Sequence, residues 1–225
     1  METLDIFFVS MVFLIYFAAT FTSMRQKILA KAEELFMQYG IKSITMDDVA
    51  KALGMSKKTL YQYVDDKNDL VRQTITHHLT EMDALCEQVF SSENNAILQM
   101  LKIAKMMNDM HQEVNPGALF DLKKYHTETY QFFTDHKENA IQNQVVKNLN
   151  LGIQQGLYRQ NINVEITAGF YIALVMECVS SEHQLLSKMP FASKYAELVR
   201  YNMHSLCTPK GLEFINAHPD LIQFS

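Results

Sequence analysis

The fold of the N-terminal region is decided by residues 45–67, which read TMDDVAKALGMSKKTLYQYVDDK. Thr45 can cap a helix by accepting the amide of Asp48, and the Asp48 carboxylate can bond back to Thr45, which together form a capping box. Gly54 ends that helix after about two turns, because glycine takes up the left-handed conformation common after a helix. Ser56 then opens another helix. The stretch predicts two short helices joined by a three-residue turn.

The second of these helices carries polar side chains on the face that the core does not use. Leu60 and Val64 share the inner face, and the outer positions are Lys57, Lys58, Thr59, Tyr61 and Gln62. Lysines at a helix N-terminus attract phosphate, and hydroxyl, ring and amide groups can meet base edges or backbone. Lys67 is placed for a flanking phosphate. A helical pair joined by a short glycine-containing turn is typical of DNA-binding helix-turn-helix motifs. The alternative is an ordinary helical hairpin with solvated lysines.

Residues 28–70, ILAKAEELFMQYGIKSITMDDVAKALGMSKKTLYQYVDDKNDL, resemble the DNA-binding domain of the tetracycline-repressor family of bacterial regulators. The resemblance implies that Thr45 and the helix opened by Ser56 contact DNA and that Lys67 contacts a phosphate. Most members carry an aromatic-His-Phe sequence where this chain has Gln62, Tyr63 and Val64, so the operator cannot be transferred from relatives. The predicted DNA-binding residues are Thr45, Ser56, Lys57, Lys58, Thr59, Tyr61, Gln62, Tyr63 and Lys67.

The whole chain reads as all-α, with an N-terminal three-helix DNA-binding domain and a larger helical C-terminal domain for dimerisation and effector binding. Apolar residues recur at helical spacing from Met24 to Tyr39, and Gly40 ends this first helix. We therefore place the helix-turn-helix domain at residues 24–70 and the C-terminal domain at residues 71–225. Only seven glycines and four prolines in 225 residues favour long helices over sheets.

Residues 1–23 differ from the remainder, because residues 6–23 carry no charge and are dominated by large apolar side chains. That length could just span a bilayer. Glu2 and Asp5, with no basic residue beside them, argue against a secretory signal. We favour translation starting at Met24, where the folded module begins. A membrane anchor and a helix packed on the body are the alternatives.

Helical spacing continues through the C-terminal region. Helices are predicted at 67–90, at 96–111, from Asn115-Pro116 onward, at 127–155, from Asn163 onward, and in a last stripe at 195–206. Thr208-Pro209 is expected to start a short tail. The family resemblance implies that the last two long helices pair with those of a second copy. A homodimer also suits a palindromic operator, whose half-sites lie about one DNA turn apart.

In the resembled family this region encloses a small-molecule pocket. Adaptable methionines and aromatic residues fill the central helices here. The expected pocket residues are Met106, Met110, Phe120, Tyr130, Phe133 and Tyr171. Such a stripe of methionines and aromatics at helical spacing is also what a plain helical core shows.

Other functional classes find little support in the sequence. Cys86, Cys178 and Cys207 stand apart, and no histidine pair has metal-ligand spacing, so we expect reduced thiols, no metal and no cofactor. Nucleophile motifs, phosphate loops and carboxylate pairs are missing, so an all-helical enzyme is the weaker alternative. Net charge is −5 for the chain, whereas residues 24–67 hold eight Lys and Arg against six Asp and Glu, giving +2. We predict a small-molecule-responsive repressor in the bacterial cytoplasm, associated with the nucleoid. A membrane-tethered regulator or adaptor is a further alternative.

Overall fold

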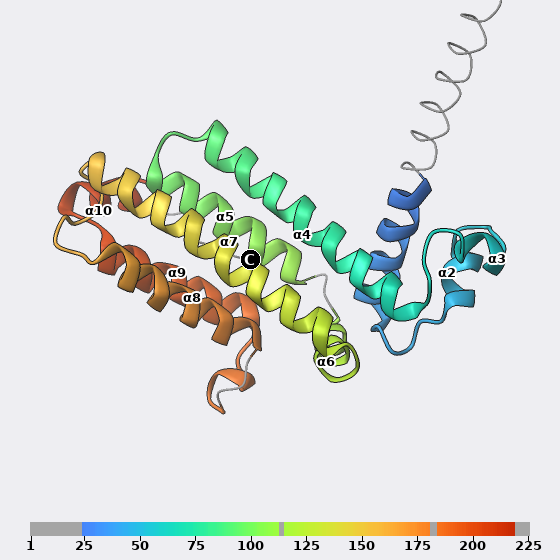
Figure 1. Ribbon diagram of the computed structural model, residues 1–225. Helices are drawn as coiled ribbons and strands as arrows, with labels where there is room; N and C mark the ends of the chain where they lie inside the picture. The colour runs from blue at the N-terminus through green and yellow to red at the C-terminus, as the bar shows by residue number, and fades with distance from the viewer. Residues whose placement is uncertain (1–23, 113–114, 181–183, 219–225) are drawn as a thin grey trace, which may run out of the picture. The chain divides into compact units, whose positions relative to one another are not determined.

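A computed structural model describes residues 24–112, 115–180 and 184–218 of the chain (Figure 1). These residues form helices and connecting turns and no β-strand, and a single isolated bridge joins Tyr158 to Cys207. The all-α prediction is confirmed. None of the helices within these residues is long and apolar enough to cross a membrane. The apolar residues 6–23 lie outside the described ranges, so the membrane-anchor alternative stays a prediction.

The caps predicted around the helix-turn-helix are present. The first helix covers residues 24–39, and Gly40 follows it with a φ of 82°. Helix α2 is Met46–Ala52, with both bonds of the capping box made: Thr45 Oγ1 accepts from the Asp48 amide at 3.2 Å, and Asp48 Oδ2 accepts from the Thr45 amide at 2.8 Å. Gly54 has a φ of 66°, a conformation that other residues rarely adopt.

Helix α3, Lys57–Leu60, is shorter than the sequence suggests. Ser56 Oγ accepts from the Thr59 amide at 3.0 Å, as a cap should. Beyond Leu60 the backbone continues in tighter turns, in which Gln62 donates to the carbonyl of Thr59 and Tyr63 to that of Leu60. Regular α-helix therefore covers one turn of the expected recognition helix.

The start of helix α4, Lys67–Ser92, is held by two carboxylates. Asp66 Oδ1 accepts from the Asp69 amide at 2.8 Å. Asp69 Oδ2 accepts from the amide of Asp65 at 2.9 Å. The arrangement resembles a capping box in which the returning carboxylate reaches one peptide further back.

The remaining helices are α5 (Ala96–Gln112), α6 (Pro116–Tyr125), α7 (Thr127–Gln154), α8 (Val164–Ser180), the 3₁₀ helix η1 (Leu186–Lys188), α9 (Phe191–Leu206) and α10 (Pro209–Asn216). Helices α5 to α8 begin and end close to their predicted positions, α9 begins four residues before the predicted stripe, and η1 was not predicted. The expectation of a tail after Thr208 is wrong, since α10 occupies it. Thr208 Oγ1 accepts from the Gly211 amide at 3.2 Å, so Thr208-Pro209 repeats the cap and proline arrangement of Asn115-Pro116.

The chain divides into two compact units. The first contains residues 24–78 together with 115–131, and the second contains residues 79–112 and 132–218. The first unit thus extends beyond the boundary predicted at residue 70 and includes α6. The functional division into DNA-binding and effector domains stays a prediction.

In the second unit, α5 and α8 pack against α9, and one tyrosine organises the end of α7. Tyr158 is 0% exposed, and its hydroxyl donates to Asn148 Oδ1 at 3.2 Å. Its ring lies against Gly152, where a Cβ atom would come within 2.0 Å of ring carbon Cδ2. Asn148 Nδ2 in turn donates to the carbonyl of Ala96 at 2.8 Å and to Gln99 Oε1 at 3.0 Å. This buried network ties α7 to the start of α5.

Candidate nucleic-acid interface

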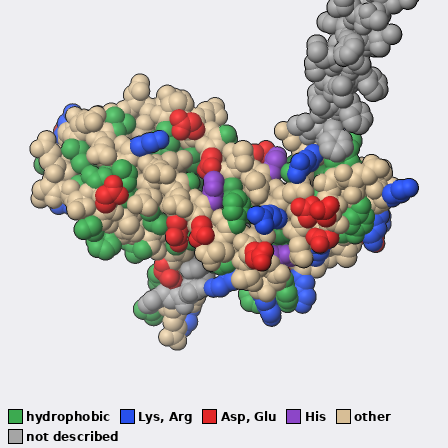
Figure 2. Space-filling view, viewed as in Figure 1, with side chains coloured by type: hydrophobic (Ala, Val, Ile, Leu, Met, Phe, Trp, Pro, Cys, Tyr) green, Lys and Arg blue, Asp and Glu red, His purple; other side chains and the backbone are tan. Residues whose placement is uncertain are grey.

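Helix α3 and the turns after it divide their side chains largely as the sequence predicts. Leu60 and Val64 are buried, Lys57, Lys58 and Gln62 are exposed, and Thr59, expected on the outer face, is half-buried. Tyr61 is 43% exposed although its ring is large and apolar. Figure 2 shows Lys and Arg side chains at the edge of the molecule formed by α2 and α3. Residues 57–62 therefore present cations, an amide and a phenol to solvent.

The two lysines of α3 differ in their partners. Lys57 Nζ lies 3.1 Å from Asp47 Oδ2 of α2, and the bond to Asp47 raises the pKa of Lys57. Lys58 makes no ion pair with any residue in the described ranges. An unpaired ammonium group needs no internal bond to break before it meets a phosphate. Of the two α3 lysines, Lys58 is accordingly the one better prepared for an external anion.

Hydroxyl groups in the predicted interface also serve as caps. Thr45 is exposed, and its Oγ1 lies 2.6 Å from Asp48 Oδ2, to which it donates. The bond with Thr45 lowers the pKa of Asp48, because it stabilises the ionised form of the capping carboxylate. Ser56 Oγ and Thr59 Oγ1 are 2.8 Å apart, with Thr59 half-buried. Because these hydroxyl groups already take part in helix capping, they have fewer hydrogen bonds left to make with DNA.

Tyr63 and Lys67 are less accessible than the resemblance implies. Both are half-buried, and the Tyr63 carbonyl accepts a long bond, 3.5 Å, from Gln73 Nε2. Lys67 Nζ donates to the Lys42 carbonyl at 3.3 Å, and burial lowers its pKa. Lys67 thus joins the start of α4 to the segment that precedes α2.

The contacts that hold the segment before α2 were not predicted from the sequence. Asp121 Oδ2, from α6, accepts from the Lys42 amide at 2.8 Å, and Lys42 Nζ donates to the Tyr125 hydroxyl at 3.0 Å. Asn115 Nδ2 donates to the carbonyl of Gln38 at 3.1 Å. Because these partners lie about 80 residues away along the chain, no local pattern could reveal them. Helix α6 therefore fixes the loop that leads into α2.

The structure distributes the six expected pocket residues over both units. Met106, Met110 and Phe133 are half-buried and Tyr171 is buried, all in the second unit. Phe120 and Tyr130 belong to the first unit, where Phe120 is 58% exposed and Tyr130 is half-buried. The assignment of these six residues to an effector pocket stays a prediction.

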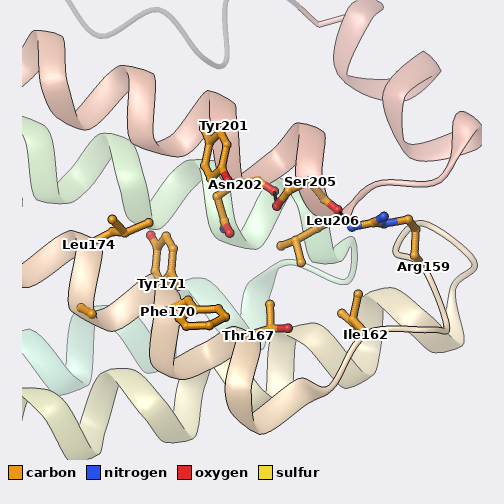
Figure 3. A pocket seen from close by; sticks show the side chains of 11 residues that line it. Arg159, Ile162, Thr167, Phe170, Tyr171, Leu174, Tyr201, Asn202, Ser205 and Leu206 are labelled. Carbon is orange, nitrogen blue, oxygen red and sulfur yellow. Dashed lines mark hydrogen bonds between the residues drawn. The ribbon is translucent and has the colours of Figure 1, made fainter.

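A hollow of about 340 Å³ lies between α8 and α9 (Figure 3). Tyr171 is the one expected pocket residue in its lining. Phe170 on α8 is 69% exposed and Tyr201 on α9 is 67% exposed. Arg159 lies at one end and donates to the carbonyl of Ser205. The face formed by α8 and α9 is thus apolar, uneven and accessible to solvent.

Comparison with known proteins agrees with this geometry. Residues 28–74 match the model of the family described as bacterial regulatory proteins, tetR family. The uncharacterized HTH-type transcriptional regulator YvaF of Bacillus subtilis is 33% identical over 167 residues, which cover 72% of this chain and 84% of that protein.

Two solved structures share the fold at low identity. A transcriptional regulator from Cytophaga hutchinsonii superposes with a TM-score of 0.67 at 18% identity, over 81% of this chain and 98% of that one. The transcriptional regulator FadR from Bacillus subtilis, solved in complex with stearoyl-CoA, gives a TM-score of 0.61 at 15% identity, over 80% and 98% of the two chains.

The cap-turn-cap arrangement and the exposed polar helix define the class as helix-turn-helix, DNA-binding transcriptional regulators. Within this class, the chain belongs to the tetR family of bacterial regulatory proteins.

Proposed function

We propose that the protein is a repressor that binds a palindromic operator as a homodimer and releases it when a small organic effector binds the C-terminal region. The observation that carries the DNA-binding half is the segment of α3 and the turn after it, where Leu60 is buried while Lys58, Tyr61 and Gln62 are exposed to solvent. A recognition helix reads base edges in the major groove, and its lysines neutralise phosphates.

The homodimer is supported by the face formed by α8 and α9. Ile166, Phe170 and Leu174 on α8 and Tyr201 on α9 are large apolar side chains exposed to solvent. Monomeric proteins rarely expose contiguous apolar patches of this kind, which mark interaction sites. In a two-fold symmetric contact the same face serves both copies, so one subunit's projecting rings can enter the other's hollow. Two recognition helices then become available for two half-sites.

Effector response is supported by the fold and by what its neighbours bind. FadR from Bacillus subtilis is described in complex with stearoyl-CoA, and KstR2 of Mycobacterium tuberculosis, with a TM-score of 0.54 at 15% identity, as a ketosteroid transcriptional regulator. A ligand can shift the DNA-binding equilibrium only by its difference in affinity for the two states. The effector must therefore bind the DNA-free conformation more tightly. We propose a role in binding and not in catalysis.

Operator binding is tested by fluorescence anisotropy with duplex DNA from the promoter beside the protein's own gene. We expect preference for this DNA over a random duplex of equal length, and a binding constant that falls linearly with salt on a logarithmic scale. Equal affinity for both duplexes at every salt concentration would contradict the proposal.

A further inference from the structure

Helix α6, in the first compact unit, carries exposed cations and exposed aromatic rings together. Lys123 and Lys124 are exposed near its C-terminal end, and Phe120 and Tyr125 are 58% and 43% exposed. Figure 2 shows Lys and Arg side chains next to hydrophobic ones at the place where Figure 1 draws this helix. Lysines in the last turn of a helix complement its dipole, which explains their charge. The dipole does not explain why two large rings are exposed beside them.

Contacts between rings and cations join these side chains to the loop before α2. Lys124 Nζ lies 5.3 Å from the centre of the Phe120 ring and 5.4 Å from that of the Tyr125 ring. Lys42 Nζ, from the loop, lies 5.0 Å from the centre of the Tyr125 ring and donates to its hydroxyl at 3.0 Å. At these distances a cation attracts an aromatic ring. The four residues form one surface, named here the α6 surface: Lys42, Phe120, Lys124 and Tyr125.

The α6 surface is continuous with the candidate nucleic-acid interface. Lys42 lies three residues before Thr45, the N-cap of α2, and both residues are exposed. Lys67 Nζ donates to the Lys42 carbonyl, and Asp121 Oδ2 of α6 accepts from the Lys42 amide. The same short loop is thus bonded on one side to the lysine predicted to contact a phosphate and on the other side to α6.

The polar groups of the α6 surface are available to a polyanion outside the protein. Lys124 makes no ion pair with a residue of the described ranges. Asp121 is the only acidic residue of α6, and its Oδ2 is already bonded to the Lys42 amide. The Tyr125 hydroxyl accepts from Lys42, so its own proton remains to be donated. Ammonium groups and a hydroxyl donor are the groups with which proteins bind the phosphates of DNA.

We propose that the α6 surface is a second DNA-contacting surface, which binds backbone phosphates in addition to the contacts made by α2 and α3. Lys124 pairs with a phosphate, Tyr125 donates to one, and Phe120 packs against deoxyribose. Backbone contacts carry no sequence information, so they strengthen binding to operator and to random duplex alike. This inference rests on the proposed operator binding and adds to it a contact surface outside the helix-turn-helix.

Anisotropy titrations across a salt series test the proposal with the full chain and a duplex that extends beyond the operator on both sides. Lys124→Gln should reduce the slope of log affinity against log salt by about 0.9 for each subunit bound, on operator and on random duplex. Lys147→Gln, exposed on α7 of the second unit, is the control and should keep the wild-type slope. Both variants should unfold at the wild-type temperature, because both side chains are exposed.

The outcome of these titrations separates this proposal from operator binding itself. A wild-type protein that binds neither duplex would contradict the proposed function. A salt-dependent wild type together with an unchanged slope in Lys124→Gln would overturn the α6 surface alone.

Photo-cross-linking locates the contact independently of affinity. Cys86, Cys178 and Cys207 are buried, and burial raises the pKa of each thiol, so a cysteine introduced at an exposed position reacts selectively with a photoactivatable label. Labelled Lys124→Cys should cross-link to operator DNA on irradiation, and labelled Lys147→Cys should not. Failure of labelled Lys124→Cys to cross-link while it is bound to the operator would also overturn the proposal.

Discussion

At the scale of single residues, the lysines of α3 show how local structure selects a contact. Lys57 is bonded to Asp47, whereas Lys58 makes no ion pair with a described residue. Adjacent residues of the same type are therefore expected to differ in their availability to DNA.

Replacing Lys58 tests this difference. Lys58→Gln should lower affinity for both operator and random duplex and reduce the slope of log affinity against log salt by about 0.9, because one phosphate contact is lost. Anisotropy titrations across a salt series measure the slope. Lys105→Gln, in α5 of the second unit, is the control and should keep the wild-type slope. An unchanged slope in Lys58→Gln would show that this ammonium group contacts no phosphate.

Gly152 illustrates a residue whose role depends on a distant side chain. Gly152→Ala would place a methyl group against the Tyr158 ring and should lower the free energy of unfolding by about 1–3 kcal/mol despite alanine's better helix propensity. Urea denaturation measures the change. Asn150→Ala, exposed on the same helix, should leave stability the same or slightly higher. Equal stabilities for the two variants would mean that the Tyr158 ring moves aside at little cost.

At the scale of elements, helix ends were predicted best, because the residues that determine them lie close together in the sequence. The caps at Thr45, Ser56 and Asn115 and the glycine after the first helix are readable within four residues, and all are present. Thr208-Pro209 carried the same signature and should have predicted α10. The bonds from α6 to the loop before α2 could not be predicted, because they depend on which segments meet in space.

The bond between Asp121 of α6 and the Lys42 amide leads to a prediction about local unfolding of the loop before α2. Asp121→Ala removes the acceptor of the Lys42 amide, so this amide should exchange its hydrogen faster, and global stability should fall by about 1 kcal/mol. Hydrogen exchange followed by mass spectrometry measures the segment around residue 42. Asp109→Ala, in α5, is the matched control and should leave that segment unchanged. Unaltered exchange in Asp121→Ala would show that other contacts suffice to hold the loop.

At the scale of the whole molecule, the sequence supported the family and the order of helices, since both follow from periodicity and motif. The effector-pocket assignment stays a prediction. Its six residues were named from the family resemblance and from their methionine and aromatic content, and the structure distributes them over both compact units. Whether side chains of different helices line one cavity depends on how those helices pack, which periodicity does not record.

The proposed dimer gives the prediction for the assembled protein. Phe170→Glu places a charge on the exposed face of α8 and should convert the dimer to monomers, because a carboxylate would be buried without a partner. Light scattering after size-exclusion chromatography measures the mass. Tyr39→Glu, exposed in the first helix, is the control and should leave the mass unchanged. A dimeric Phe170→Glu protein would place the contact on another face.

The first compact unit is assembled from two stretches of chain, 24–78 and 115–131. During synthesis its N-terminal stretch leaves the ribosome before α6 exists to bond the loop at Lys42. The helix-turn-helix therefore lacks its bonds to α6 until residues up to 131 have emerged. A chain truncated at residue 78 would lack these bonds permanently. The Lys42 amide and the Gln38 carbonyl would then form hydrogen bonds with water instead.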